Sequence, residues 1–133
     1  MKVDMGNAKQ SSVQSVVRAL SLLEILGGLG GEAPLSELAE EAALALPTVH
    51  RLLKTLTSLG YVRQLPSRRY ALGPALVALG DQATRLIASW ARPALRTLEE
   101  ATRETANLAI LDGDRVVDVA QVPSRKQMRK ITE

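Results

Sequence analysis

Apolar residues recur at helical spacing near the start of the chain. One stripe at the 3.6-residue period is formed by Val13, Val16, Val17, Leu20, Leu23, Ile25 and Leu26. The run from Gly27 to Gly31 follows, and its glycines disfavour a continued helix. The pattern therefore predicts a helix that begins near Ser12 and ends near Leu26.

A second, shorter helix is predicted after Pro34 and Leu35. Leu38 and Ala39 supply its buried side. Ser36 is expected to be the N-cap, because a serine hydroxyl accepts a hydrogen bond from a free N–H of the first turn. Acidic residues crowd this segment, where the positive end of the helix dipole favours them.

A third helix is predicted from Pro47, which suits a first helical position because its missing N–H has no partner there. Its core face consists of Val49, Leu52, Leu53 and Leu56. Its opposite face holds Pro47, Arg51, Lys54 and Ser58, flanked by His50 and Thr55. The outward face is thus basic and rich in hydrogen-bonding groups, and Gly60 is expected to end the helix.

Two strand-like runs follow, at residues 61–64 and 69–72, on either side of a Pro66–Ser67 turn signal. They predict a small hairpin that carries Arg63, Arg68 and Arg69. Tyr61 and Tyr70 are expected to pack this hairpin against the helices.

The remaining chain has two further helical patterns and a second hairpin. The first helix is expected to run from Gly73–Pro74 to about Trp90, and the next from Pro93 to about Glu104. Residues 107–111 and 115–122 predict strands around Asp112–Gly113. The fold class is therefore mainly α with small β hairpins. The expected divisions are a flexible N-terminus (1–11), a winged helix-turn-helix (12–73), a linker helix (74–90) and the start of an α+β segment (91–133).

Charge is uneven along the chain, although the net charge is only +3. No Asp or Glu occurs from Ala42 to Gly80, and that segment holds Arg51, Lys54, Arg63, Arg68 and Arg69. Such a segment is typical of a face that binds a polyanion. The alternative is a solvated surface on which the charges cluster by chance.

Several function classes lack the residues they need. The chain has no cysteine and one histidine, which argues against a disulfide framework and against zinc. No nucleophile–base pair or paired carboxylates appear, and Glu99–Glu100 is interpreted as a solvated helix face. We expect no enzyme activity, no metal and no cofactor. No stretch is long and apolar enough for a membrane span, and no signal peptide is recognisable, so a cytoplasmic location is expected.

Three helices followed by a basic hairpin are the element order of a winged helix-turn-helix, whose recognition helix enters the major groove of DNA. The helix near Ser36 is expected to brace it against the backbone, and the hairpin arginines to grip flanking phosphates. The predicted contacts to double-stranded DNA are Ser36, Pro47, Thr48, His50, Arg51, Lys54, Thr55, Arg63, Arg68 and Arg69.

Each candidate also has a structural explanation that stays open at this point. Arg51 is able to form a surface salt bridge, and Lys54 to be a solvated helix lysine. His50 suits a half-buried structural role, and Thr48 suits stabilisation of the first turn. Arg68 and Arg69 fit a mobile charged loop. Trp90 is expected to pack at a helix junction or at a dimer contact rather than to bind a ligand.

These residues resemble the IclR family of bacterial transcriptional regulators. The likeness is carried by residues 15–20, 23–24, 47–53, 59–62 and 69–73. Further on, residues 103–109, 112–113, 121–122 and 128–129 are similar to the start of the family's effector-binding domain.

The resemblance implies a repressor or activator that binds operator DNA as a homodimer or a higher oligomer. It implies a linker helix over about residues 75–89, and a C-terminal GAF-like domain that binds a small organic acid effector. Because the chain stops at Glu133, we expect only the beginning of that domain, as in a fragment or a shortened relative. A second departure is Ala43, which stands in a turn where the family has glycine. The competing hypothesis is a winged helix that docks a protein partner.

Overall fold

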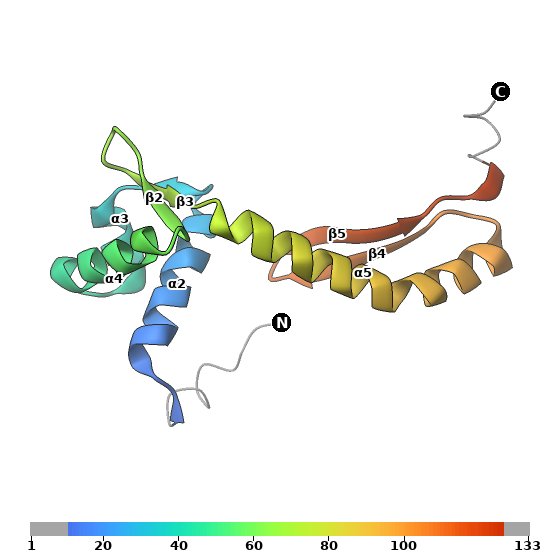
Figure 1. Cartoon of the computed structure of the whole chain (residues 1–133), viewed down its shortest axis with the longest axis horizontal. Helices are drawn as coiled ribbons and strands as arrows, with labels where there is room; N and C mark the ends of the chain where they lie inside the picture. Colours follow the sequence, from blue (N-terminus) through green and yellow to red (C-terminus); the bar gives the residue numbers. More distant parts are fainter. Residues whose placement is uncertain (1–10, 127–133) are drawn as a thin grey trace. The chain divides into compact units, whose positions relative to one another are not determined.

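The computed structural model describes residues 11–126 and confirms a mainly helical fold with small antiparallel sheets (Figure 1). The expected flexibility of the N-terminus concerns residues that lie, up to residue 10, outside this range. In chain order the elements are α2 (Gln14–Gly28), β1 (Glu32–Ala33), α3 (Leu35–Ala42), α4 (Leu46–Ser58), β2 (Val62–Gln64), β3 (Tyr70–Leu72), α5 (Ala75–Thr102), β4 (Ala106–Asp112) and β5 (Arg115–Val122).

The described residues fall into two compact units, one that ends at Leu79 and one that begins at Gly80. The first contains α2, α3, α4 and a three-stranded sheet, which is the winged helix-turn-helix. The second contains most of α5 and the β4–β5 hairpin.

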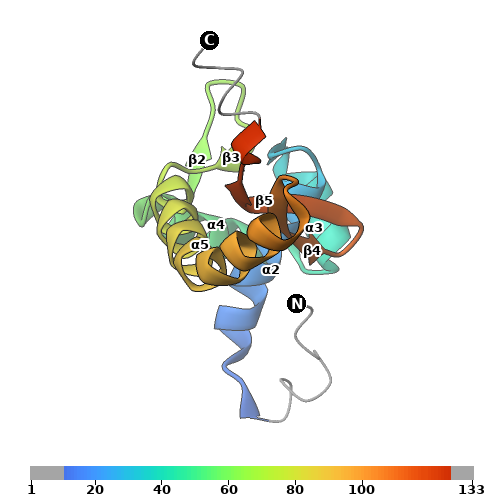
Figure 2. The same cartoon turned by 90° about the vertical axis from the view of Figure 1, so that its right-hand side faces the viewer.

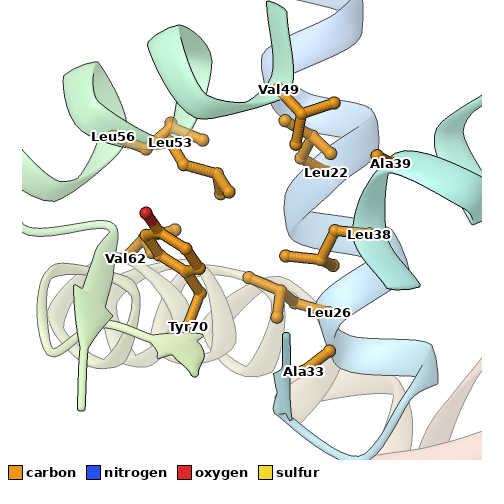
Figure 3. Packing of buried hydrophobic residues seen from close by; sticks show 10 residues of the cluster. All are labelled: Leu22, Leu26, Ala33, Leu38, Ala39, Val49, Leu53, Leu56, Val62 and Tyr70. Carbon is orange, nitrogen blue, oxygen red and sulfur yellow. The ribbon is translucent and has the colours of Figure 1, made fainter. Parts of the chain in front are cut away.

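The core of the first unit is a cluster of apolar side chains from all three helices and the sheet (Figure 3). Leu22 and Leu26 of α2 and Leu53 of α4 are fully buried in it. Its other buried members are Ala33, Leu38, Ala39, Val49, Leu56, Val62 and Tyr70. The predicted core face of α4 is confirmed, with Leu52 half-buried at its margin. Since that face is held inward, the opposite face of α4 is held outward.

The predicted apolar stripe of α2 is partly wrong. Leu22 is completely buried and was missed, whereas Val13, Val16 and Leu20 are more than half exposed. The cause is that α3 and α4 contact only a narrow strip of α2, centred on Leu22 and Leu26. Many apolar residues around this helix hid that strip in the sequence pattern.

The sheet has the strand order β1-β3-β2, with both pairs antiparallel. The predicted hairpin corresponds to β2 and β3. Sequence reasoning missed β1, which has only two residues and pairs with β3 about forty residues away in the chain. Tyr70 is buried and Tyr61 packs against the core, so the expected role of both tyrosines is confirmed.

The starts of α3 and α4 differ slightly from the prediction. Ser36 is not the N-cap of α3. Pro34 takes that position with an extended backbone, its carbonyl accepts a bond from Leu38 N at 3.2 Å, and Ser36 lies inside the first turn. A cap needs a non-helical backbone, which Ser36 therefore lacks. α4 begins at Leu46, one residue before Pro47, where a proline is still tolerated because the first-turn N–H groups have no helical partner.

Ala43 ends α3 in a left-handed conformation, with φ 53° and ψ 43°. The neighbouring amide of Leu44 donates to Ala39 O at 3.1 Å, and the equivalent bond after α4 runs from Tyr61 N to Leu56 O at 3.0 Å. In that second turn the left-handed position holds Gly60, with φ 84°. The same turn therefore ends both helices, once with the favoured residue and once with alanine.

We expect Ala43→Gly to stabilise the protein by about 1 kcal/mol, because glycine removes the contact between Cβ and backbone that penalises a left-handed residue. The matched control is Ala42→Gly, one residue earlier within the helix, which should destabilise by about 0.5–1 kcal/mol. Urea unfolding followed by circular dichroism measures both changes. Equal effects of the two substitutions would contradict the assignment of strain to Ala43.

The prediction of a helix end near Trp90 and a new start at Pro93 is wrong, because α5 is one helix with Pro93 inside it. Its buried residues Ala88, Leu95 and Glu99 share one face on both sides of the proline. An interior proline costs about 3 kcal/mol. Burial of a continuous face offsets this cost, a non-local effect that the local sequence does not reveal.

The second unit confirms the predicted hairpin and corrects two residues. β4 and β5 pair antiparallel, and the strands end on a two-residue loop at Gly113–Asp114. Glu99 is not solvated, since only 4% of it is exposed. Its carboxylate accepts a hydrogen bond from Arg125 N at 3.3 Å, which ties the chain after β5 to α5. Trp90 is 70% exposed, so it does not pack at a helix junction within the described chain.

Candidate nucleic-acid interface

The outward face of α4 carries the predicted recognition residues. Pro47, His50, Arg51, Lys54 and Thr55 are exposed, and Thr48 is half-exposed beside the buried Val49. The Thr55 hydroxyl donates to Arg51 O at 3.2 Å, which leaves its oxygen lone pairs free to accept. The face thus offers cationic and hydroxyl groups on a helix that the core holds in place.

The cations of this face are not neutralised. Within residues 11–126, neither Arg51 nor Lys54 forms an ion pair with a carboxylate. The salt-bridge explanation for Arg51 therefore finds no partner among the described residues. His50 is exposed, which argues against a structural role in the core.

The wing is the loop that joins β2 and β3, and it projects away from the three helices in both views (Figure 1, Figure 2). It closes by two hydrogen bonds of 2.8 Å, from Leu65 N to Arg69 O and from Arg68 N to Leu65 O. Arg68 is exposed with φ 69°, and Arg63 is exposed on β2. In the described part of the chain neither arginine has an acidic partner. A projecting, uncompensated cationic loop suits contact with phosphates.

Arg69 differs from the other two wing arginines. Its Nε lies 3.2 Å from Glu32 Oε1 on the adjacent edge strand, and about two-fifths of its side chain is exposed. The contact is an ion pair without the alignment of a hydrogen bond, since Nε has no hydrogen-bond partner. Part of the cationic charge that the sequence attributes to the wing is therefore compensated by β1.

A concave patch joins α4 to α2. Its lining residues are Ser15, Arg18, Thr48, Arg51, Leu52 and Thr55. The structure therefore brings Thr48, Arg51 and Thr55 together, while Ser36 stands apart on the first turn of α3 and the wing arginines stand on the sheet. Sequence reasoning missed Ser15 and Arg18. Recognition of Leu22 as the buried position of α2 would have pointed to Arg18, one helical turn earlier on the same side.

The described residues offer no alternative chemistry. Residues 11–126 contain no group of three metal-ligating side chains. Within the same range, none of the helices combines the length and the apolar character needed to cross a membrane.

Known proteins match both the sequence and the structure. Residues 15–66 match the model of the IclR helix-turn-helix domain. The chain is 39% identical over 103 residues to the transcriptional repressor IclR of Escherichia coli, covering 75% of this chain and 38% of that protein. It is 32% identical over 129 residues to the regulator TtgV of Pseudomonas putida, covering 96% and 50%. The chain spans half or less of the length of these curated relatives, which are transcriptional regulators rather than enzymes.

Solved structures agree with the sequence relatives. An IclR family transcriptional regulator from Brucella abortus matches with a TM-score of 0.67 at 26% identity, covering 95% of this chain and 47% of that one. A second from Alicyclobacillus acidocaldarius matches with a TM-score of 0.61 at 34% identity, covering 84% and 47%. The exposed cationic helix and wing, the family domain over residues 15–66 and these relatives lead to one assignment. This chain belongs to the IclR family of transcriptional regulators.

Proposed function

We propose that the chain binds a specific operator in double-stranded DNA as a homodimer, with α4 in the major groove and the wing on flanking phosphates. The observation that carries the proposal is the exposed face of α4, where Arg51 and Lys54 have no described acidic partner. Major-groove recognition requires such a face, because arginine donates to guanine and threonine bonds to several bases. The proposed contacts remain those predicted from the sequence, with Arg69 shared between DNA and Glu32.

The wider role follows from the relatives. They support a non-enzymatic regulator of transcription that acts in the bacterial cytoplasm. A homodimer is supported by Leu86 and Trp90, which lie four residues apart on α5 and are 50% and 70% exposed. Exposed apolar side chains at this spacing suit contact with a second helix. Response to a small organic acid effector belongs to the effector domain of the relatives, of which this chain contains the beginning.

A protein-docking winged helix is the competing function. Its contact surface would be expected to have an apolar centre with few charges. The exposed face of α4 instead centres on Arg51 and Lys54, and the apolar residues of this helix point into the core. The charge distribution therefore favours DNA.

Selection of bound sequences from random duplex DNA tests the proposal. We expect an inverted-repeat consensus, because half-site spacing mirrors the two-fold symmetry of a dimer. Affinity for the selected duplex should fall linearly with salt on a double-logarithmic plot, since each phosphate contact contributes a slope of about −0.9. Recovery of no consensus, together with equal affinity for selected and random duplexes, would contradict specific binding.

A further inference from the structure

The further inference concerns Arg18, on the helix that precedes the helix-turn-helix. Leu22 of α2 and Val49 of α4 are fully buried next to each other in the core (Figure 3). Arg18 lies one helical turn before Leu22, and Thr48 directly precedes Val49. The packing of the two apolar residues therefore fixes the start of α2 beside the first turns of α4. Arg18 and Arg51 line the same concave patch as a result.

The charge of Arg18 is available for a ligand. The side chain is half-buried and forms no ion pair with a carboxylate of residues 11–126. Glu41 lines a neighbouring concavity together with Arg18, yet the two do not pair. A half-buried guanidinium loses part of its hydration, and a second guanidinium beside it repels it. An anion in the patch relieves both costs.

The remaining lining groups fit an oxyanion. Ser15 and Thr48 each carry a hydroxyl, and neither hydroxyl takes part in a hydrogen bond within the described chain. Guanidinium and hydroxyl groups are the side chains that most often contact DNA phosphates. Leu52 supplies an apolar margin that limits access of water from the core side.

We propose that Arg18, with Ser15 and Thr48, binds one phosphodiester of the DNA backbone next to the groove occupied by α4. The proposal rests on the function proposed above and extends it to α2. Because Arg18 is on α2 rather than on the inserted helix, its contact fixes the position of the protein on the duplex and does not read sequence. It is a positioning residue that orients α4.

Phosphate-ethylation interference on the selected duplex tests this site, because ethylation blocks individual backbone contacts. We expect Arg18→Gln to lose interference at one phosphate per half-site and to keep it elsewhere. Affinity should fall about tenfold, the usual effect of losing one charge-assisted hydrogen bond. The salt slope should decrease by about 0.9 for each lost contact. The consensus sequence should not change.

The control is Arg85→Gln, which removes the same charge from an arginine of α5 that pairs with Asp81. It should leave the interference pattern unchanged. Arg18→Lys keeps the charge and should restore most of the affinity, and melting temperatures of all variants check that α2 still folds. If wild-type protein binds the duplex and Arg18→Gln retains every interference position, the Arg18 site is overturned while the proposed function stands. If wild-type protein binds no selected duplex, both are overturned.

Discussion

Gly73→Ala is expected to destabilise the winged helix-turn-helix by about 3 kcal/mol, at the upper end of the usual cost of overpacking. Gly73 is buried where β3 meets the turn that follows α4. A Cβ at this position would overlap Gly60 O and lie 2.8 Å from the backbone carbon of Tyr61. Both obstacles are main-chain atoms, which have no rotamer to change.

The same backbone groups also hold the wing, which adds to the effect. Gly73 N donates to Tyr61 O at 2.8 Å, and Ala75 N donates to Gly60 O at 3.1 Å. Any shift that accommodates the methyl group lengthens these bonds. Loss of the bonds would release the end of β3 from the end of α4, so DNA affinity should fall together with stability.

Urea unfolding followed by circular dichroism measures the loss, and Gly28→Ala is the matched control. Gly28 lies at the end of α2, where an added Cβ meets no atom within 4 Å. That substitution should be neutral or stabilising by up to about 1 kcal/mol, because alanine favours the helix. An unfolding midpoint of Gly73→Ala equal to that of the wild-type protein would show that the backbone yields easily here.

The sequence was most informative where one helix carried two clearly different faces. In α4, the apolar residues from Val49 to Leu56 and the polar residues from Pro47 to Ser58 separate at the helical period, so burial followed directly. The wing was equally predictable, since Pro66 and Ser67 mark its turn between two short strand-like runs. Local chemistry is sufficient in both cases.

Non-local contacts account for what the sequence did not reveal. β1 exists because it pairs with β3, and this pairing also brings Glu32 to Arg69. The continuity of α5 through Pro93 and the burial of Glu99 depend on contacts within the second unit. Arg18 joins the candidate interface only because Leu22 packs against α4. In each case a residue's role depends on a partner that local patterns do not identify.

Arg51→Ala is expected to lower affinity for the selected duplex by about tenfold to a hundredfold, which corresponds to about 1–3 kcal/mol for a bidentate contact to guanine. Arg51 is exposed in the middle of the outward face of α4 and has no acidic partner among residues 11–126. The loss should be concentrated at one base pair of each half-site, where the variant should accept other bases. Binding titrations with single-base-pair variants of the duplex measure this selectivity.

Arg68→Ala distinguishes base reading from charge alone, because Arg68 is equally cationic and exposed but lies on the wing. Its removal should weaken binding to all duplexes by a similar factor and reduce the salt slope by about 1, without relaxing any position. If α4 reads bases and the wing contacts phosphates, the two variants separate in selectivity rather than in affinity. Two identical, uniform losses would mean that the outward face of α4 contributes only charge, and that sequence is read by another part of the protein.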